Sequence, residues 1–297
     1  MLRLAVTTDA ETFARMREPL ADRGIAVSHL QAKQRAIPLT DDTVATTPES
    51  ADAVAEFDVG FVYPGRLMEG AAITAGHPFP WVNDRGAVLT SRNKAGVIAA
   101  LDAADIPVPA SVMLSNPVDA SAVVDAVADL SFPVVIKPNS ATRGVGVAKA
   151  ADLDSLLGVV DYLDLVHDFR ATGDKSYIVQ EFLPDARDYR VMVIDGDCVG
   201  GVERRVADDL ADGRWKHNVH RGATATGVDL PESHRELAEA VAAELAIPYL
   251  GVDLLETPDR LVVSETNARP TIDAAEKYAA GFYDRLAGVI RATAGRS

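Results

Sequence analysis

The chain of 297 residues carries 44 acidic and 29 basic side chains, which give a formal net charge of −15, and 48% of its residues are hydrophobic. A surface this acidic repels the phosphate backbone, which argues against nucleic acid as a partner. No apolar run approaches the ~20 residues of a membrane helix, and the apolar start at residues 2–6 has no signal-peptide core. We therefore expect a cytoplasmic protein that does not contact a membrane.

Cysteine and lysine are both scarce. The single Cys198 allows no intrachain disulfide, which fits a reducing compartment, and its apolar neighbours favour a buried filler over a nucleophile. Only 7 of the 29 basic residues are lysine. A strongly acidic, lysine-poor chain is typical of a salt-adapted organism, in which high ionic strength screens the repulsion between surface carboxylates. We therefore expect a halophilic protein whose carboxylates are mostly surface groups.

The first 88 residues alternate strands with a helix, which predicts a small α/β unit. Its expected elements are a strand over 2–7, a helix over 11–22, and strands over 25–30 and 59–63. A helix over 92–104 follows and is stopped by two prolines. We place a domain boundary just before this helix.

Two α+β units are expected after that boundary. The unit over 89–175 contains a helix over 120–130, strands over 132–137 and 146–150 joined by a glycine-containing loop, and a helix over 153–169. The unit over 176–297 contains strands over 177–182, 189–194, 198–205, 251–255 and 261–267, with helices over 231–245 and 274–292. The fold class is therefore α/β followed by α+β.

The last two predicted strands carry oxygen ligands. Glu265 and Asn267 are two residues apart and share one face of their strand, while Asp253 lies on the neighbouring strand. Mg²⁺ typically takes one or two protein carboxylates and completes its shell with water and nucleotide phosphates. The pattern indicates a metal–nucleotide site, although a hairpin with merely solvated polar ends would show the same residues.

Two lysines are candidates for phosphate contacts. Lys137 ends an apolar strand and precedes a loop at 140–147, in which glycines would let backbone N–H groups approach phosphate oxygens. Lys94 lies early in the helix over 92–104. An ordinary hairpin and a solvated helix lysine remain alternatives. Neither the P-loop pattern nor GxGxxG is present.

Other polar segments point to the same chemistry. Gln180, Glu181 and Phe182 end an apolar strand, where backbone groups can read an adenine edge, although an exposed strand end is equally compatible. A basic cluster stands out against the acidic background and would suit phosphate or an anionic transition state. It comprises Arg190, Arg204, Arg205, Arg214, Lys216 and Arg221. His217 and His220 have no third soft ligand, so zinc is not expected.

Taken in chain order, these segments resemble the ATP-grasp superfamily and, more narrowly, the RimK-type α-L-glutamate ligases. The resemblance runs from about residue 90 to residue 277, and the first 85 residues share only the general character of the pre-ATP-grasp α/β domain. It implies an ATP-grasp fold in which an N-terminal α/β domain precedes two α+β subdomains that enclose a nucleotide.

The resemblance also implies roles for particular residues. The positions implied to contact ATP are Lys94, Lys137, Gln180, Glu181, Phe182, Asp188, Lys216, His217 and Asn218. Asp253, Glu265 and Asn267 match the ligands of two Mg²⁺ or Mn²⁺ ions. The implied catalytic residues, which face the reacting groups, are Arg204, Arg221 and Asn218.

The implied reaction is ATP-dependent amide-bond formation in two steps. A carboxylate of a small molecule or peptide attacks the γ-phosphate to give an acyl phosphate, and an amino acid, expected to be L-glutamate, then displaces phosphate. No side-chain nucleophile is needed. The alternatives are another amino-acid ligase of the glutathione-synthase, D-Ala-D-Ala-ligase or lysine-biosynthesis type, or a regulatory protein that binds ATP without turnover. We also expect a homo-oligomer.

Two departures from the family pattern concern the loops around the site. The loop at 140–146 lacks a glycine at its start and carries Arg143, so its flexibility as a lid is in question. Where the family commonly has a small residue and then Pro-Gly, this chain has Ala268, Arg269, Pro270 and Thr271. Our hypothesis is that Arg269 pairs with an acidic acceptor such as a glutamyl chain.

Overall fold

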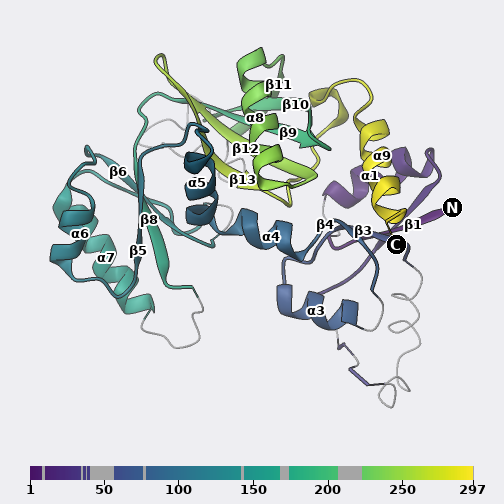
Figure 1. Ribbon diagram of the computed structural model, residues 1–297, viewed down its shortest axis with the longest axis horizontal. Coiled ribbons are helices and arrows are strands. Elements are labelled where there is room, and N and C mark those ends of the chain that lie inside the picture. The colour runs from purple at the N-terminus through teal and green to yellow at the C-terminus, as the bar shows by residue number, and fades with distance from the viewer. Residues whose placement is uncertain are drawn as a thin grey trace.

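The computed structural model describes residues 1–8, 11–34, 36–37, 39–40, 57–75, 78–141, 144–167, 174–206 and 223–296. The described residues form three sheets, spread along an elongated molecule with both termini at one end (Figure 1). Within these ranges no helix is both long and apolar enough to cross a membrane.

The N-terminal sheet is parallel, with strand order β2-β1-β3-β4. Its elements are β1 (Leu2–Val6), α1 (Glu11–Ala21), β2 (Ile25–His29), β3 (Val59–Val62), α3 (Leu67–Ala75) and β4 (Trp81–Asn83). All four residues of β3 are buried, as expected for a strand covered on both faces. Packing requires glycine at position 60, because a Cβ there would lie 2.2 Å from the indole ring of Trp81.

The central sheet is antiparallel, with strand order β5-β8-β6-β7. Its elements are β5 (Ser111–Ser115), α6 (Ala120–Ala126), β6 (Val134–Pro138), β7 (Ala148–Ala150), α7 (Leu153–His167) and β8 (Ser176–Glu181). Val123 of α6 and Leu156 of α7 pack with Ile136 and Val179 in one core. The strand over 177–182 was predicted to belong to the third unit, whereas β8 lies inside this sheet. Strand pairing over such a distance is not visible in local periodicity.

The third sheet is antiparallel, with strand order β11-β10-β9-β12-β13. Its elements are β9 (Arg187–Ile194), β10 (Asp197–Val206), β11 (Ala223–Val228), α8 (Glu232–Leu245), β12 (Tyr249–Glu256) and β13 (Leu261–Asn267). One face packs Val191, Leu250 and Val252 against α8 and against Leu101 of the preceding helix α5 (Lys94–Ala103). The alternate residues of the strands therefore lie on the opposite face.

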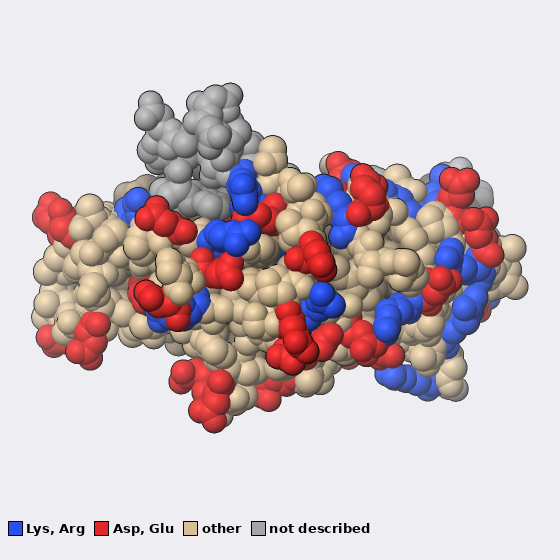
Figure 2. All heavy atoms as spheres, turned by 90° about the horizontal axis from the view of Figure 1, so that it is seen from above, with Lys and Arg blue, Asp and Glu red and all other residues tan. Residues whose placement is uncertain are grey.

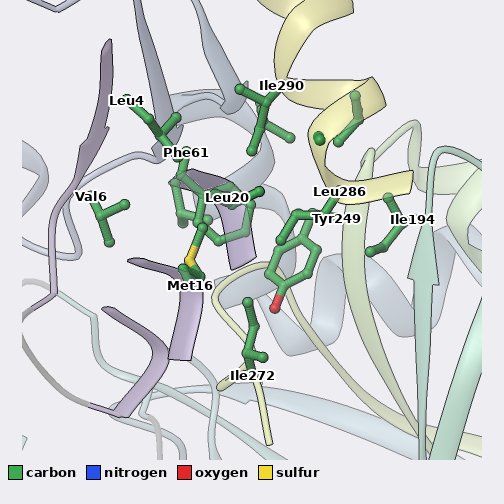
Figure 3. Packing of buried hydrophobic residues seen from close by; sticks show 14 of the residues in the cluster. Leu4, Val6, Met16, Leu20, Phe61, Ile194, Tyr249, Ile272, Leu286 and Ile290 are labelled. Atoms are coloured by element: carbon green, nitrogen blue, oxygen red, sulfur yellow. The ribbon is translucent and has the colours of Figure 1, made fainter. Parts of the chain in front are cut away.

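That opposite face is apolar at one end and polar at the other. At the apolar end Ile194 and Tyr249 join the core of the N-terminal sheet and of helix α9 (Phe282–Ala294), as Figure 3 shows. The rings of Phe61 and Tyr249 are 4.7 Å apart, centroid to centroid. The first and third sheets therefore share one hydrophobic core, which places the polar end of the face beside the carboxyl ends of the N-terminal strands.

A buried asparagine fixes the same junction. Asn83, at the end of β4, is fully buried, and its amide donates to the carbonyl oxygens of Tyr249 (2.6 Å) and Ala268 (2.7 Å). Its Oδ1 accepts a hydrogen bond from the Tyr249 backbone N–H at 3.1 Å. Each such bond contributes about 1 kcal/mol, and an unsatisfied buried amide would cost more. Asn83 thus ties the N-terminal sheet to β12 and to Ala268, the residue that follows β13.

The helices differ from the prediction at three places, and one of them is α6, which ends at Ala126 instead of residue 130. The helix expected over 92–104 is α5 (Lys94–Ala103), and a separate helix that was not predicted, α4 (Arg85–Arg92), precedes it with Asn93 between the two. Asn93 caps α5, because its Oδ1 accepts from the Gly96 N–H at 3.1 Å. The last predicted helix begins later than expected, since only the short turn η4 (Ala275–Lys277) precedes α9. Sequence reasoning missed α3, α4, β4, β5 and β11.

Charge is spread unevenly over the face in Figure 2. Acidic and basic side chains alternate over most of it, whereas the left end, formed by the central sheet and its helices in Figure 1, shows acidic groups with few basic ones. Exposed Asp154 and Asp161 of α7 belong to this part of the chain. High ionic strength would screen the repulsion between the carboxylates of such an acidic surface.

Candidate active site

Strand register brings the candidate metal ligands together. Across β9, β12 and β13, Arg190 lies opposite Asp253, and Asp253 lies opposite Glu265. Directly opposite residues of antiparallel strands point to the same side of a sheet. Asn267, two residues beyond Glu265, lies on that side too and opposite Gly251. The three oxygen ligands predicted from the sequence therefore gather on the polar end of the third sheet.

Asp253 is the most heavily paired of these groups. It is only 5% exposed, and its two carboxylate oxygens accept from Nε and Nη2 of Arg190 at 2.7 Å each. Arg204 approaches the same carboxylate at 3.1 Å and bonds Asp188 through Nε at 3.0 Å. Burial by itself would raise the pKa of Asp253, but Arg190 and Arg204 outweigh it and hold that pKa below its ordinary value.

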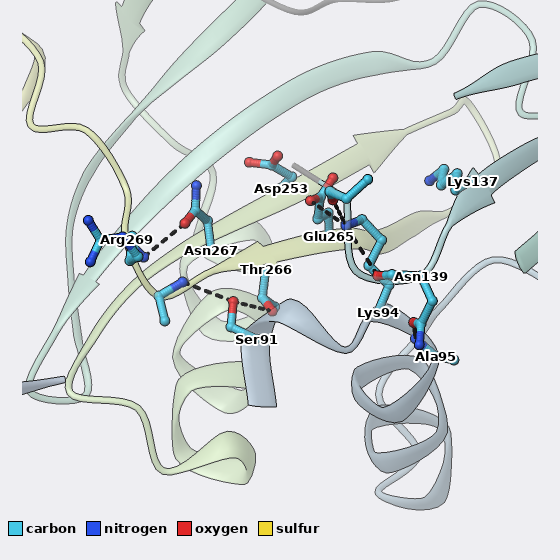
Figure 4. Close-up of polar contacts among 12 residues, drawn as sticks. Ser91, Lys94, Ala95, Lys137, Asn139, Asp253, Glu265, Thr266, Asn267 and Arg269 are labelled. Atoms are coloured by element: carbon cyan, nitrogen blue, oxygen red, sulfur yellow. Dashed lines mark hydrogen bonds and ion pairs between the residues drawn. The ribbon is translucent and has the colours of Figure 1, made fainter. Parts of the chain in front are cut away.

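Two lysines approach from other elements, as Figure 4 shows. Lys94, the first residue of α5, is 9% exposed, and its Nζ lies 3.4 Å from Oε1 of Glu265. Lys137 projects from β6 of the central sheet, and its Nζ donates to Oε1 of Gln180 at 2.6 Å. Burial lowers the pKa of Lys137 although the carboxylate of Glu265 opposes it. A lysine in this position would regain favourable charge pairing from a bound anion.

The start of α5 is fastened to the end of β6 through Asn139. Its Oδ1 accepts from the Ala95 N–H at 2.9 Å, and its Nδ2 donates to Oδ1 of Asn93 at 3.0 Å. The Nζ of Lys94 donates to the carbonyl oxygen of Ala141 in the same loop, at 2.5 Å. The loop after β6 thus positions Lys94. Sequence reasoning missed Asn139, and the cap pattern at Asn93 was the available signal.

The strand-end segment 180–182 lies on the central sheet beside Lys137. Gln180 is 2% exposed and bridges Lys137 to the hydroxyl of Ser111, to which its Nε2 donates at 2.8 Å. Oε1 of Glu181 accepts from the Ala110 N–H at 2.7 Å, and Oε2 of Glu181 pairs with Arg260. The ammonium group of Lys149 lies over the ring of Phe182, at 4.7 Å from the ring centroid. These side chains are held in place by neighbouring protein groups.

Several predicted residues lie outside the described residues. They are Lys216, His217, Asn218 and Arg221 of the expected site, and Arg143 of the expected lid. Arg190 was noticed in the sequence only as part of a basic cluster, whereas its bidentate pairing with Asp253 makes it central to the arrangement. Arg205 points elsewhere, because its guanidinium pairs with Glu203 at 2.9 Å.

The assembled groups match a metal–polyphosphate site in chemistry. Four basic side chains from two sheets and one helix converge on three carboxylates, which are those of Asp188, Asp253 and Glu265. Carboxylate and amide oxygens are hard donors of the kind Mg²⁺ and Mn²⁺ prefer. Within the described ranges no group of three or more His, Cys, Asp or Glu side chains is placed to hold a metal. The donors that are present, two carboxylates and one amide oxygen on β12 and β13, suit an ion that takes its remaining ligands from phosphate and water.

Comparison with known proteins decides the family. The RimK-like ATP-grasp domain matches residues 91–283 of this chain. The chain belongs to the RimK-like ATP-grasp family. The resemblance drawn from the sequence is thereby confirmed, and the family domain covers α5, the central sheet and the third sheet.

Among its RimK-like relatives is the ribosomal protein bS6–L-glutamate ligase of Escherichia fergusonii, which is 30% identical over 198 residues. That match covers 66% of this chain and 62% of the ligase. A probable α-L-glutamate ligase of an Enterobacter species is also 30% identical, over the same shares of the two chains. The chain thus spans less than two thirds of the length of these curated relatives.

Solved structures extend the likeness to the whole chain. D-alanine–D-alanine ligase of Bacillus anthracis, complexed with ATP, matches with a TM-score of 0.69 and 17% identity over 100% of this chain and 98% of that one. A RimK domain ATP-grasp protein of Sphaerobacter thermophilus matches with a TM-score of 0.65 and 21% identity, covering 98% and 99%. At such identities the likeness concerns the fold. The predicted ATP-grasp fold, with mixed α/β and α+β elements, is confirmed.

Proposed function

We propose that this protein is an ATP-dependent ligase that joins a carboxylate to the amine of an amino acid, with L-glutamate as the amino acid added. The observation that carries the proposal is the convergence of Lys94, Lys137, Arg190 and Arg204 on Asp253 and Glu265. Membership of the RimK-like family supports the reaction class. The printed names of the bS6–L-glutamate ligase and the probable α-L-glutamate ligase support glutamate.

Each proposed nucleotide contact is assigned from the helix or strand on which its residue lies. Lys94 and Lys137 bind ATP phosphates, since the Lys94 ammonium group lies 3.4 Å from Glu265 and the charges of Glu265 and Asp253 act on the pKa of Lys137. Gln180, Glu181 and Phe182 border the adenine, and Asp188 borders the ribose. The remaining proposed contacts, outside the described residues, are Lys216, His217 and Asn218.

The proposed ligands of two Mg²⁺ or Mn²⁺ ions are Asp253, Glu265 and Asn267. Such ions neutralise charge on a transferring phosphoryl group and orient its oxygens. In the described structure Asp253 is engaged by two arginines and Glu265 by Lys94. Binding of the metal–nucleotide complex would therefore exchange these ion pairs, with the freed cations of Lys94, Arg190 and Arg204 facing phosphate oxygens.

The proposed reaction has two steps. A carboxylate oxygen of the acceptor attacks the γ-phosphorus, an O–P bond forms, and the bond to the bridging oxygen breaks as ADP leaves. The glutamate amine then attacks the acyl carbon, phosphate leaves with the electron pair of the C–O bond, and the amine proton passes to the departing phosphate. Arg204 and Arg221 are the residues proposed to stabilise the negative charge that moves in both steps, and Asn218 is the third proposed catalytic residue. The acceptor is a small-molecule or peptide carboxylate.

The test is release of ADP and phosphate from Mg²⁺-ATP, with L-glutamate and a panel of carboxylates, and with products read by mass spectrometry. A product heavier by one glutamyl residue is the expected result. A product carrying a different amino acid would move the protein to another ATP-grasp ligase, such as the glutathione-synthase, D-Ala-D-Ala or lysine-biosynthesis type. Tight ATP binding without release from any pair would favour a regulatory ATP-binding protein and refute the ligase.

The setting of the protein is part of the same proposal. We infer a homo-oligomer that works in the cytoplasm of a salt-adapted organism. The single Cys198 and the net charge of −15 support the compartment and the habitat. Cell fractionation would test the compartment, and light scattering during size-exclusion chromatography in KCl would test the oligomer. A monomer at micromolar concentration would contradict the homo-oligomer.

A further inference from the structure

Two arginines meet where the N-terminal sheet abuts the end of β13. Arg269 follows β13, and its Nη1 donates to the hydroxyl of Thr7 at 3.2 Å and to the carbonyl oxygen of Tyr63. Arg92 ends α4, and its Nη2 donates to the carbonyl oxygen of Gly65 at 2.9 Å. Thr7 and Tyr63 directly follow β1 and β3. The arginines therefore lie at the carboxyl edge of a parallel sheet, where α/β folds bind ligands.

The two guanidinium groups flank a single small residue. A Cβ placed on Gly65 would lie 3.5 Å from Nε and 3.7 Å from Cζ of Arg269, and 3.8 Å from Nη2 of Arg92. Gly65 is not among the glycines with a positive φ, so its backbone does not itself demand glycine. The missing side chain leaves the space between the two cations open.

The charge of this pair is not balanced locally. Across the described part of the chain, no carboxylate forms an ion pair with Arg92 or Arg269, whereas Arg187, Arg190 and Arg204 all have carboxylate partners. Burial, together with the smaller effect of the Arg92 charge, lowers the pKa of Arg269 to about 10. Holding two like charges together costs free energy that an anion between them would recover.

The pair also borders the proposed reaction centre. Arg269 lies two residues beyond Asn267, whose Oδ1 accepts from the Arg269 backbone N–H at 2.8 Å. Arg92 lies two residues before Lys94. In Figure 4, Asn267 lies between Arg269 on one side and Asp253 and Glu265 on the other. An anionic group held by the pair would thus belong to a molecule that reaches the reaction centre.

We propose that Arg92 and Arg269 form a subsite for a carboxylate of the acidic substrate, a carboxylate that is not the one activated by ATP. This inference rests on the proposed ligase function. A guanidinium fork is suited to bidentate carboxylate binding, and Arg92 and Arg269 approach the space over Gly65 from two elements. The carboxylate belongs either to the glutamate that is added or to a glutamyl group of the acceptor.

A purely structural role would be a clamp between β13 and the N-terminal sheet. Gly65→Ala separates the two roles, because it retains both charges and their hydrogen bonds while placing a methyl group in the space between them. Its nearest contact would be an ordinary 3.5 Å, so the fold should survive. A clamp would not be affected by this methyl group, whereas a carboxylate subsite would be partly filled.

The experiment is isothermal titration calorimetry of the full chain with Mg²⁺ and a non-hydrolysable ATP analogue present. The two probes are L-glutamate and N-acetyl-L-glutamyl-L-glutamate, whose blocked amine makes it an acceptor mimic. The variants are Arg92→Gln, Arg269→Gln, Arg269→Lys and Gly65→Ala. Arg66→Gln is the matched control, since Arg66 adjoins Gly65 but is 60% exposed and pairs with Glu69.

Arg92→Gln and Arg269→Gln should each lower the affinity for one probe by about tenfold or more, which is the contribution of a hydrogen bond between charged groups. Arg269→Lys should weaken it less, Gly65→Ala should also weaken it, and Arg66→Gln should stay within about twofold of wild type. Nucleotide affinity should be unchanged throughout. An effect on L-glutamate alone assigns the subsite to the added amino acid, and an effect on the blocked dipeptide alone assigns it to the acceptor.

Two results would overturn the subsite. One is wild-type affinity of both probes in every variant, and the other is failure of both probes to bind wild-type protein that binds the nucleotide. Phosphate release reports separately on the ligase. Arginine-dependent probe binding without any turnover would retain the subsite and reject the ligase, whereas turnover with unchanged probe binding would do the reverse.

Discussion

Asp253→Asn should destabilise the protein by about 3 kcal/mol. Removing one partner of a buried ion pair costs about 3–5 kcal/mol, because the other charge stays buried without its counterion. Arg190 keeps a side-chain exposure of 26%, so water can partly compensate, which places the estimate at the lower end. Arg204, at 11% side-chain exposure, keeps Asp188 as a partner and should contribute less.

A double-mutant cycle separates the pair from its surroundings. Arg190→Gln, Asp253→Asn and the double variant would be unfolded in urea, followed by circular dichroism, in KCl sufficient to keep the wild type folded. The double variant should cost about 2 kcal/mol less than the sum of the single variants, because neither charge is then left alone. Asp58→Asn is the control. Asp58 pairs with Arg3 at 3.0 Å, but both side chains are exposed, so its loss should cost under about 1 kcal/mol.

The pH dependence of the same variants carries a definite sign. The pKa of Asp253 is lower in the folded chain than in the unfolded chain, so its contribution to the free energy of unfolding is complete above about pH 4, the unfolded pKa. That contribution is lost as the pH falls through the folded pKa. Wild-type stability should therefore fall faster below pH 4 than that of Asp253→Asn. Equal costs for Asp253→Asn and Asp58→Asn, or strict additivity in the cycle, would refute the reasoning.

Three further predictions concern binding, folding and salt. Lys137→Met should raise the Kd for Mg²⁺-ATP by about tenfold or more, while Lys33→Met, at an exposed site, should leave it unchanged; equal titration curves would remove Lys137 from the phosphate site. Asn83→Ala should lower the free energy of unfolding by about 2–3 kcal/mol, because three buried hydrogen bonds are lost, and a urea midpoint equal to wild type would contradict this. Thermal stability should rise from dilute buffer to molar KCl as carboxylate repulsion is screened, and a flat dependence of Tm on salt would argue against halophilic adaptation.

Much of the secondary structure was predictable because it depends on patterns of neighbouring residues. Apolar runs and alternation located most strands, and glycine and proline marked where helices end. The elements that were missed are those with weak local patterns. Strand β4 has three residues, α3 contains an internal glycine, and α4 has only eight residues. Helix α5 starts where Asn93 caps it, a boundary that hydrophobic periodicity alone cannot place.

The candidate site was predictable only in part. The proximity of Asp253, Glu265 and Asn267 was predictable because they lie on two strands adjacent in sequence, whose antiparallel pairing sets which residues face each other. The importance of Arg190 and Asn139 was not evident, since each acts through a partner far along the chain. Arg190 lies 63 residues from Asp253, and Asn139 lies 46 from Asn93.

By itself, the sequence determined the chemistry available to this protein. It specified hard oxygen donors on a hairpin, a lysine at the end of a buried strand, scarce cations in an acidic chain, and the order of segments typical of its family. These features are local, or depend only on the order of residues, so periodicity and spacing express them.

Only the tertiary structure decided which groups meet. It placed β8 in the central sheet, engaged Asp253 with Arg190 and Arg204, and brought Arg92 and Arg269 to the two sides of Gly65. Contacts of this kind join segments that are distant in sequence, and they depend on how three sheets pack around a shared core. The free energy that selects that packing belongs to the whole chain, so no single segment reveals it.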